Sequence, residues 1–156
     1  MKESLNKAVE ELKRVEHLVF VSLKYTRTAD VLKSIIQRTI TTFSFGFEAI
    51  LIYAKEQKLI TDFPENLALR CNVLKEIFPD KKELHEYIDY YLKLRKIMRA
   101  EYTQREEYRR HVTMSVVIEG EPIDITMDSA KEDFEMLHRF IKYVNEFIFG
   151  KPEEEY

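Results

Sequence analysis

The sequence predicts an all-α protein, an up-and-down bundle of about five helices with a small β-hairpin (about 112–127) inserted before the last helix. Three observations lead to this prediction. Apolar residues recur three and four positions apart over most of the chain, as in amphipathic helices. Only three glycines and four prolines interrupt this pattern. Near residue 112 the apolar spacing changes to two, which is typical of a strand.

Two helices are expected in the first part of the chain. The first covers about residues 3–25. The second begins with Thr28 as its N-cap and continues to about Lys58. Its apolar residues lie on most sides, so we expect it at the centre of the bundle. Gly46 in its middle costs about 1 kcal/mol relative to Ala, and we infer that it permits close helix packing.

Two further helices are expected. Each begins at a pair of acidic residues with capping-box spacing, Asp62 with Glu65 and Asp80 with Glu83. The pair at 62–65 opens a short third helix that ends at Phe78, before a proline. The pair at 80–83 opens a fourth helix, which we expect to continue to about Arg110.

The end of the chain combines strands with a last helix. Alternating apolar residues over 112–118 and 123–127 surround the turn "EGEP" and predict a β-hairpin. Ser129 and Glu132 have capping-box spacing and begin a last helix over residues 130–149.

Length and composition restrict the kinds of protein this chain can be. Its 156 residues indicate a single domain over 1–150 and a polar tail at 151–156. A net charge of −3 excludes uniform attraction to nucleic acid, so any contact with phosphate requires a local basic patch. The single cysteine, Cys71, excludes an internal disulfide and a cysteine-based zinc site. No apolar stretch approaches the roughly 20 residues of a membrane span, so we expect a cytoplasmic protein without membrane contact.

A basic patch does occur between Lys93 and His111, where seven Lys or Arg residues stand against three Glu residues. Arg105 falls on the continuation of the apolar stripe of the fourth helix. Burying an unpaired guanidinium costs several kcal/mol, so Arg105 must meet a carboxylate, a phosphate or water in a cleft. Alternatively, the helix end leaves the core and Arg105 pairs with a neighbouring Glu.

Arg105 and His111 together are the candidate catalytic pair. Imidazole transfers protons near neutral pH and an arginine binds phosphate through two hydrogen bonds. Such a pair supports metal-free RNA cleavage, in which the histidine takes the 2′-hydroxyl proton and the arginine stabilises charge on the phosphate. On a straight helix the two side chains would lie about 120° apart. They converge only if the helix ends before His111. The alternative to a catalytic role is that His111 is an ordinary surface histidine at a helix end.

The layout of the helices resembles the HEPN superfamily (higher eukaryotes and prokaryotes nucleotide-binding domain). The segment "ADVLKSIIQRTITTFSFGFEAILIYAKEQKL" is similar to its long central helix, and "YLKLRKIMRAEYTQREEYRRH" is similar to the helix that bears its R-x(4–6)-H motif. The resemblance covers about residues 28–149 and concerns architecture more than the motif. It implies a homodimer whose paired Arg–His sets face a shared cleft. Family members include RNases, often toxins beside a nucleotidyltransferase-type antitoxin, and members without catalysis.

Two departures from the family pattern leave the motif register open. The polar residue that usually follows the arginine, often Asn or Asp, is Glu106 here. Arg95 also fits the motif arginine, and Tyr102 then stands where a histidine belongs. In that register the motif is degenerate and the protein is not a catalyst.

These observations predict a helical module that binds RNA or a nucleotide through a basic helix. A metal-independent RNase would use Arg105 and His111, and we expect no metal and no cofactor. The expected partners are a second copy of the chain, RNA or a nucleotide, and an antitoxin-like nucleotidyltransferase. The alternative is a non-catalytic helical protein for interaction or dimerisation. The residues predicted to contact nucleic acid are Arg95, Arg99, Tyr102, Arg109 and Arg110.

Overall fold

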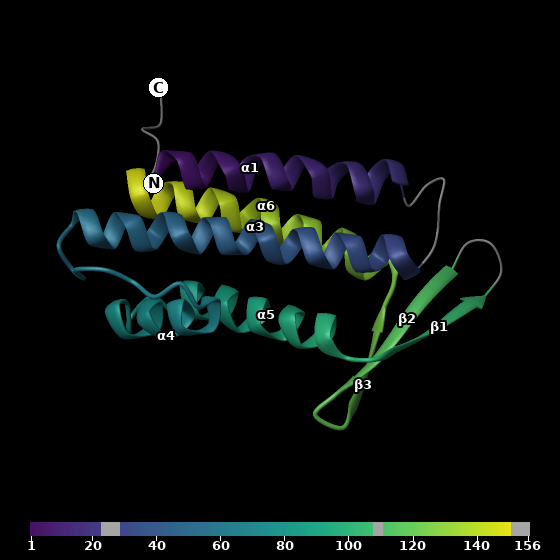
Figure 1. Ribbon diagram of the computed structural model, residues 1–156. Coiled ribbons are helices and arrows are strands. Elements are labelled where there is room, and N and C mark those ends of the chain that lie inside the picture. The colour runs from purple at the N-terminus through teal and green to yellow at the C-terminus, as the bar shows by residue number, and fades with distance from the viewer. Residues whose placement is uncertain (23–28, 108–110, 151–156) are drawn as a thin grey trace.

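The computed structural model describes residues 1–22, 29–107 and 111–150, with the side chains of 103–107 and 111–112 left aside. Within these ranges it contains five α-helices, a π-helical turn and three strands (Figure 1). The all-α bundle with a hairpin before the last helix is therefore confirmed. The elements are α1 (Lys2–His17), η1 (Leu18–Ser22), α3 (Ala29–Glu56), α4 (Leu67–Ile77), α5 (Lys82–Arg99), β1 (Tyr102–Glu107), β2 (His111–Ile118), β3 (Glu121–Ile125) and α6 (Met127–Phe149).

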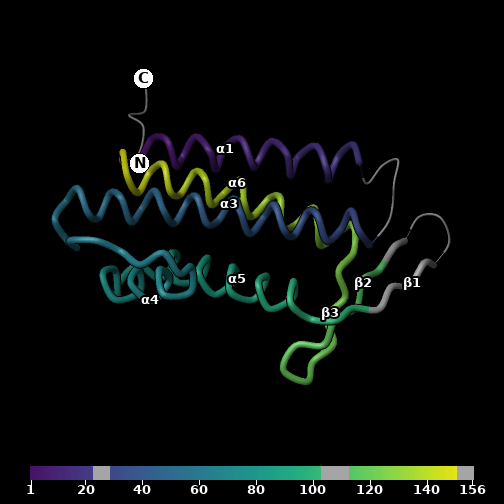
Figure 2. The backbone as a smooth tube through the Cα atoms, viewed as in Figure 1, coloured from purple at the N-terminus to yellow at the C-terminus, as the bar shows by residue number. Residues whose placement is uncertain are grey.

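The helices form two layers with the sheet at one end. Helices α1, α3 and α6 run side by side, α4 and α5 cover the other side of α3, and the three strands lie beyond the end of α5 (Figure 2). Helix α3 contacts α1, α4, α5 and α6, which confirms that it is central. Of the described helices, α3 alone is long and apolar enough to cross a membrane, but 61% of that stretch is buried inside the bundle. The central helix of a soluble bundle has these properties as well.

Gly46 permits the closest approach of two helices in the core. The ring of Phe140 on α6 lies directly against the backbone of α3 at Gly46, where a side chain of any size would meet it. Phe43 and Phe47 on α3 pack around the same ring, with Tyr87 of α5 on its other side. The inference that this glycine serves helix packing is confirmed.

The fourth helix ends eleven residues earlier than predicted. Helix α5 stops at Arg99, because Ala100 has an extended backbone. The following residues form strand β1, which pairs with β2 in antiparallel register from Tyr102 opposite Val116 to Glu107 opposite His111. Because β1 is an outer strand of the sheet, hydrogen bonds to β2 satisfy the backbone groups along one of its two sides. The predicted helix to Arg110 is therefore wrong.

The predicted hairpin is correct and is joined by β1 in a three-stranded sheet of order β1-β2-β3. A two-residue turn, Glu119–Gly120, connects β2 and β3, and both residues have positive φ, as in a type I′ turn. Met114, Val116 and Ile125 are buried. The sheet therefore closes one end of the core, which is how an otherwise marginal hairpin becomes stable.

Two helix starts differ from their predictions. The N-cap of α4 is Asn66, whose Oδ1 accepts a hydrogen bond from the Leu69 amide at 3.0 Å, rather than a residue of the pair at 62–65. Helix α5 begins after Lys81 without a side-chain cap, so the pair at 80–83 forms no capping box. Acidic spacing alone did not distinguish caps from solvated charges.

The last helix begins earlier than predicted. Thr126 and Ser129 form the capping box of α6, each side chain accepting a hydrogen bond from the other's backbone amide. Ser129 is therefore the third helical residue instead of the N-cap, and Glu132 has no capping role. The predicted N-cap Thr28 and the tail at 151–156 lie outside the described residues.

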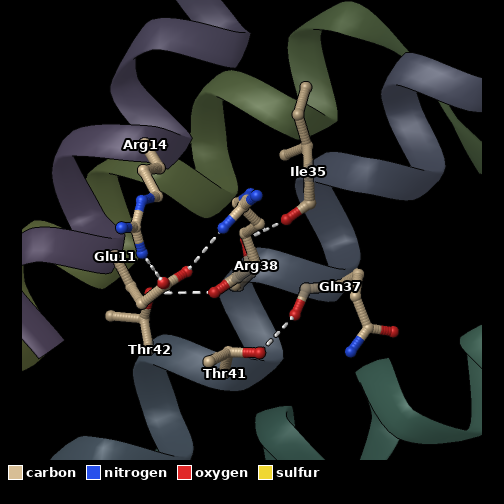
Figure 3. Close-up of polar contacts among 8 residues, drawn as sticks. Glu11, Arg14, Ile35, Gln37, Arg38, Thr41 and Thr42 are labelled. Atoms are coloured by element: carbon tan, nitrogen blue, oxygen red, sulfur yellow. Dashed lines mark hydrogen bonds and ion pairs between the residues drawn. The ribbon is translucent and has the colours of Figure 1, made fainter. Parts of the chain in front are cut away.

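A buried carboxylate joins α1 to α3 (Figure 3). Glu11 on α1 is buried and accepts hydrogen bonds from two arginines, Arg14 one turn along α1 and Arg38 on α3, the latter at 3.2 Å. Both arginine side chains are about half exposed. Two charge-assisted bonds compensate the desolvation of the carboxylate and fix the register of the two helices.

Candidate nucleic-acid interface

Arg95 is the best-anchored of the predicted site residues. It lies on α5 and is half-buried, with its guanidinium carbon 5.6 Å from the centre of the Tyr91 ring. Its Nη1 is buried and has no hydrogen-bond partner among the described residues. A buried donor left without a partner costs about 1–3 kcal/mol. The contact with Tyr91 holds the guanidinium in one place, and an anion would have to be bound through nitrogens other than the buried Nη1.

The surroundings of Arg95 hold it in a fixed polar cluster. The hydroxyl groups of Tyr91 and Ser44 are hydrogen-bonded at 3.0 Å, joining α5 to α3. Burial raises the pKa of the Tyr91 phenol, while the hydrogen bond to Ser44, the charge of Arg95 and a hydrogen bond with Arg95 oppose that rise. Burial also raises the pKa of the Cys71 thiol to about 11, which favours the protonated thiol at neutral pH.

The last turn of α5 carries two more basic residues. Lys96 forms an ion pair with Glu119 in the β2–β3 turn at 2.7 Å, and both side chains are mostly exposed. The pKa of Glu119 is lowered by its hydrogen bond to Lys96 and by that positive charge. Arg99 is exposed and forms no ion pair with any side chain that the structure describes. Cations at a helix C-terminus also offset the helix dipole, which by itself explains their presence.

Tyr102 begins strand β1 and is half-buried. The Lys33 ammonium of α3 lies 5.5 Å from the centre of its ring. This cation–π contact joins the start of α3 to the junction between α5 and β1. Lys33 was not among the predicted site residues, because only the fold brings the start of α3 beside the end of α5.

Arg105 and His111 lie on two paired strands instead of on one helix. The register places Arg105 opposite Thr113 and His111 opposite Glu107, so the two are diagonal neighbours. Diagonal positions of an antiparallel pair are about 7–8 Å apart. The condition for their convergence, a helix that ends before His111, is met by the hairpin. The predicted position of Arg105 on the helical stripe is wrong, and Arg109 and Arg110 lie outside the described residues.

Comparison of the chain with protein-family models, with curated proteins and with solved structures finds no match. The geometry of the described residues is therefore what supports a function.

The candidate interface consists of the half-buried Arg95 and the exposed Arg99 one turn further along α5. The contact between Lys33 and Tyr102 adds to it at the start of the sheet. No group of three or more metal-binding side chains occurs within the described parts of the chain. The arrangement provides positive charge and an aromatic ring along one edge, the chemistry that contacts phosphates and bases.

Sequence reasoning missed the buried carboxyl groups of Glu11 and Asp133. Asp133 on α6 is 8% exposed, and burial raises the pKa of its carboxyl from 3.8 to about 7. Its position fits the buried stripe of α6, between Ala130 and Leu137. That spacing of three and four was visible in the sequence, but an aspartate among the charged residues of "SAKEDFEM" resembles a solvated position.

Proposed function

We propose that the chain is an RNA- or nucleotide-binding module whose phosphate-binding edge comprises the C-terminal half of α5 and the β1–β2 strand pair. Arg95 carries the proposal. Its half-buried guanidinium is held over the Tyr91 ring, and the planar group is suited to bind an oxyanion. Arg99, exposed one turn further along the same helix, extends the positive edge.

Binding of RNA should depend on these two arginines and on salt. We expect Arg95→Gln and Arg99→Gln each to weaken binding of a single-stranded RNA oligonucleotide about tenfold at low salt, because each removes a contact with phosphate. The slope of log K against log salt should decrease by about 1 for each change. Fluorescence anisotropy with labelled RNA measures both quantities.

The matched control is Lys142→Gln, which removes an exposed positive charge from α6. It should leave the salt slope unchanged. Arg95→Lys keeps the charge but loses the planar group over Tyr91, so it should also weaken binding. If Arg95→Gln, Arg99→Gln and Arg95→Lys all bind RNA with the affinity of the wild type, the proposed edge is wrong.

The catalytic version of the proposal rests on the diagonal positions Arg105 and His111. We expect slow cleavage of mixed RNAs in the presence of EDTA, because the step requires no metal. His111→Ala should abolish cleavage and keep most of the RNA affinity, since it removes the proton acceptor and not the phosphate-binding arginines. Gel analysis of the RNA, with anisotropy on the same samples, separates the two effects.

If the RNA stays intact with both the wild type and His111→Ala, and RNA affinity is preserved, the protein is a binding module. That result would favour Arg95 as the motif arginine. Cleavage that survives His111→Ala would contradict the catalytic version.

A homodimer is part of the same proposal, and several large apolar side chains are available for such an interface. Sedimentation analysis of the full chain tests it. The exposed apolar residues are Phe20, Val21, Leu59, Leu69, Val117 and Phe149.

A further inference from the structure

A second site lies on the other side of α5, where a small pocket of about 170 Å³ opens between α3, α5, β3 and α6. Its inner wall is apolar and belongs to the core, formed by Ile36, Leu94, Ile97 and Ile125, all buried. An engineered apolar cavity of about 150 Å³ accepts benzene. The pocket therefore has room for a ligand built around one six-membered ring.

The most deeply buried polar group in the lining of this pocket is the carboxyl of Asp133. The residue is more than nine-tenths buried and lines the pocket. It has no hydrogen bond or ion pair with any residue within 1–22, 29–102 and 113–150. A carboxylate in an apolar environment without a partner is costly, so a bound group that donates hydrogen bonds to it is favoured.

The mouth of the pocket adds to the negative charge. Asp124 and Glu132 are exposed there and Lys93 is the one basic residue in the lining, so with Asp133 the charges are one positive and three negative. Asp124 accepts a hydrogen bond from Ser115 at 2.7 Å. The lining has a net negative charge, which attracts cations and repels phosphates. The pocket is thus distinct in chemistry from the basic edge of α5.

We propose that this pocket binds a small organic cation, an ammonium or amidinium group carried on a compact apolar body. The cationic group pairs with the Asp133 carboxylate, and the apolar body rests against the isoleucine and leucine side chains. Neither RNA nor a nucleotide has this combination of positive charge and apolar surface. The site is independent of the proposed nucleic-acid function and stands if that function fails.

The test uses benzylamine as the probe and benzyl alcohol as its neutral counterpart of equal size. Both are titrated into the full chain at pH 8, and binding is followed by amide chemical shifts in NMR. We expect benzylammonium to bind at least tenfold more tightly than benzyl alcohol. Asp133→Asn should remove this preference, while Glu132→Gln, which removes an exposed carboxylate at the mouth, should reduce it only slightly.

A further variant, Ile123→Phe, enlarges a half-buried side chain of the lining and should exclude both probes. Circular dichroism of each variant establishes that it is folded. Equal affinity for the two probes, or full preference for benzylamine in Asp133→Asn, would overturn the proposal. So would shifts confined to residues outside the pocket. Stronger binding in Lys93→Met would support it, because that change removes a competing cation.

Discussion

Gly46→Ala should destabilise the protein by about 2–3 kcal/mol, although helix propensity alone predicts a gain of about 1 kcal/mol. The reason is steric. A methyl group at this position would lie 2.6 Å from Cζ of Phe140 and still closer to Cε2. Carbon atoms in a packed core are normally 3.5–4.0 Å apart, so either the ring or the helix must move.

The ring of Phe140 has little freedom to move. It is fully buried, and its centroid lies 4.5 Å from that of Phe43, 5.2 Å from that of Phe47 and 5.1 Å from that of Tyr87. A displacement of the ring would therefore disturb aromatic contacts on three sides. The expected cost exceeds the propensity gain, and the sign of the effect distinguishes packing from propensity.

Urea unfolding of the wild type and of Gly46→Ala measures this cost. A double-mutant cycle with Phe140→Leu provides the control, since a smaller side chain leaves room for the methyl group. In that background Gly46→Ala should be close to neutral. A stabilising effect of Gly46→Ala in the wild type would show that α3 and α6 do not approach each other as closely as the structure describes.

The bundle was predictable because its helices carry a strong and regular apolar period. The central position of α3 followed from apolar residues on nearly all of its sides, and the hairpin followed from a period of two on either side of a glycine turn. Neither inference requires knowledge of what the segment contacts. Both therefore survive comparison with the structure.

The boundary between α5 and β1 was not predictable in this way. Residues 101–107 are polar and lack a clear period, so their state depends on a partner strand that follows them in the chain. Extending the stripe of α5 through Tyr102 to Arg105 treated a long-range interaction as a local one. For the candidate site the consequence is direct, because Arg105 and His111 occupy diagonal positions of a strand pair and do not lie on one helix.

The buried face of α6 differs in part from its prediction, for a related reason. The spacing in the sequence predicts a buried face of Phe134, Leu137, Ile141, Val144 and Phe147 or Ile148. The structure buries Leu137, Val144 and Ile148 of these, but in place of Phe134 and Ile141 it buries Asp133 and Phe140, one position earlier. Both stripes have helical spacing, and apolar content favours the first. Packing against Gly46 selects the second, because Phe140 fits there. This orientation of α6 buries the Asp133 side chain in the core, which is why its carboxyl has an unusual environment.

Asp133→Asn should stabilise the protein by roughly 2–4 kcal/mol at pH 8 and by much less at pH 4. Burial raises the pKa of the carboxyl from 3.8, its ordinary value, to about 7 in the folded state. Between these values the folded protein binds more protons at this site than the unfolded chain. The contribution of Asp133 to stability is therefore neutral below about pH 4, decreases as the pH rises to about 7, and is constant above that.

Urea unfolding of both proteins at pH 4, 5, 6, 7 and 8 tests this expectation, and the quantity of interest is the difference in the free energy of unfolding between them. The other ionisable groups at the pocket are Tyr90 and Lys93 on α5, Asp124 on β3 and Glu132 on α6. They are present in both proteins and contribute little to the difference, and Glu132→Gln, which changes an exposed carboxylate beside the pocket, is the matched control. Parallel stability curves would mean that Asp133 is solvated. A difference that grows with pH would mean that the Asp133 carboxylate is a destabilising charge in the core of the folded protein. A cation that binds the folded state alone would offset that destabilisation.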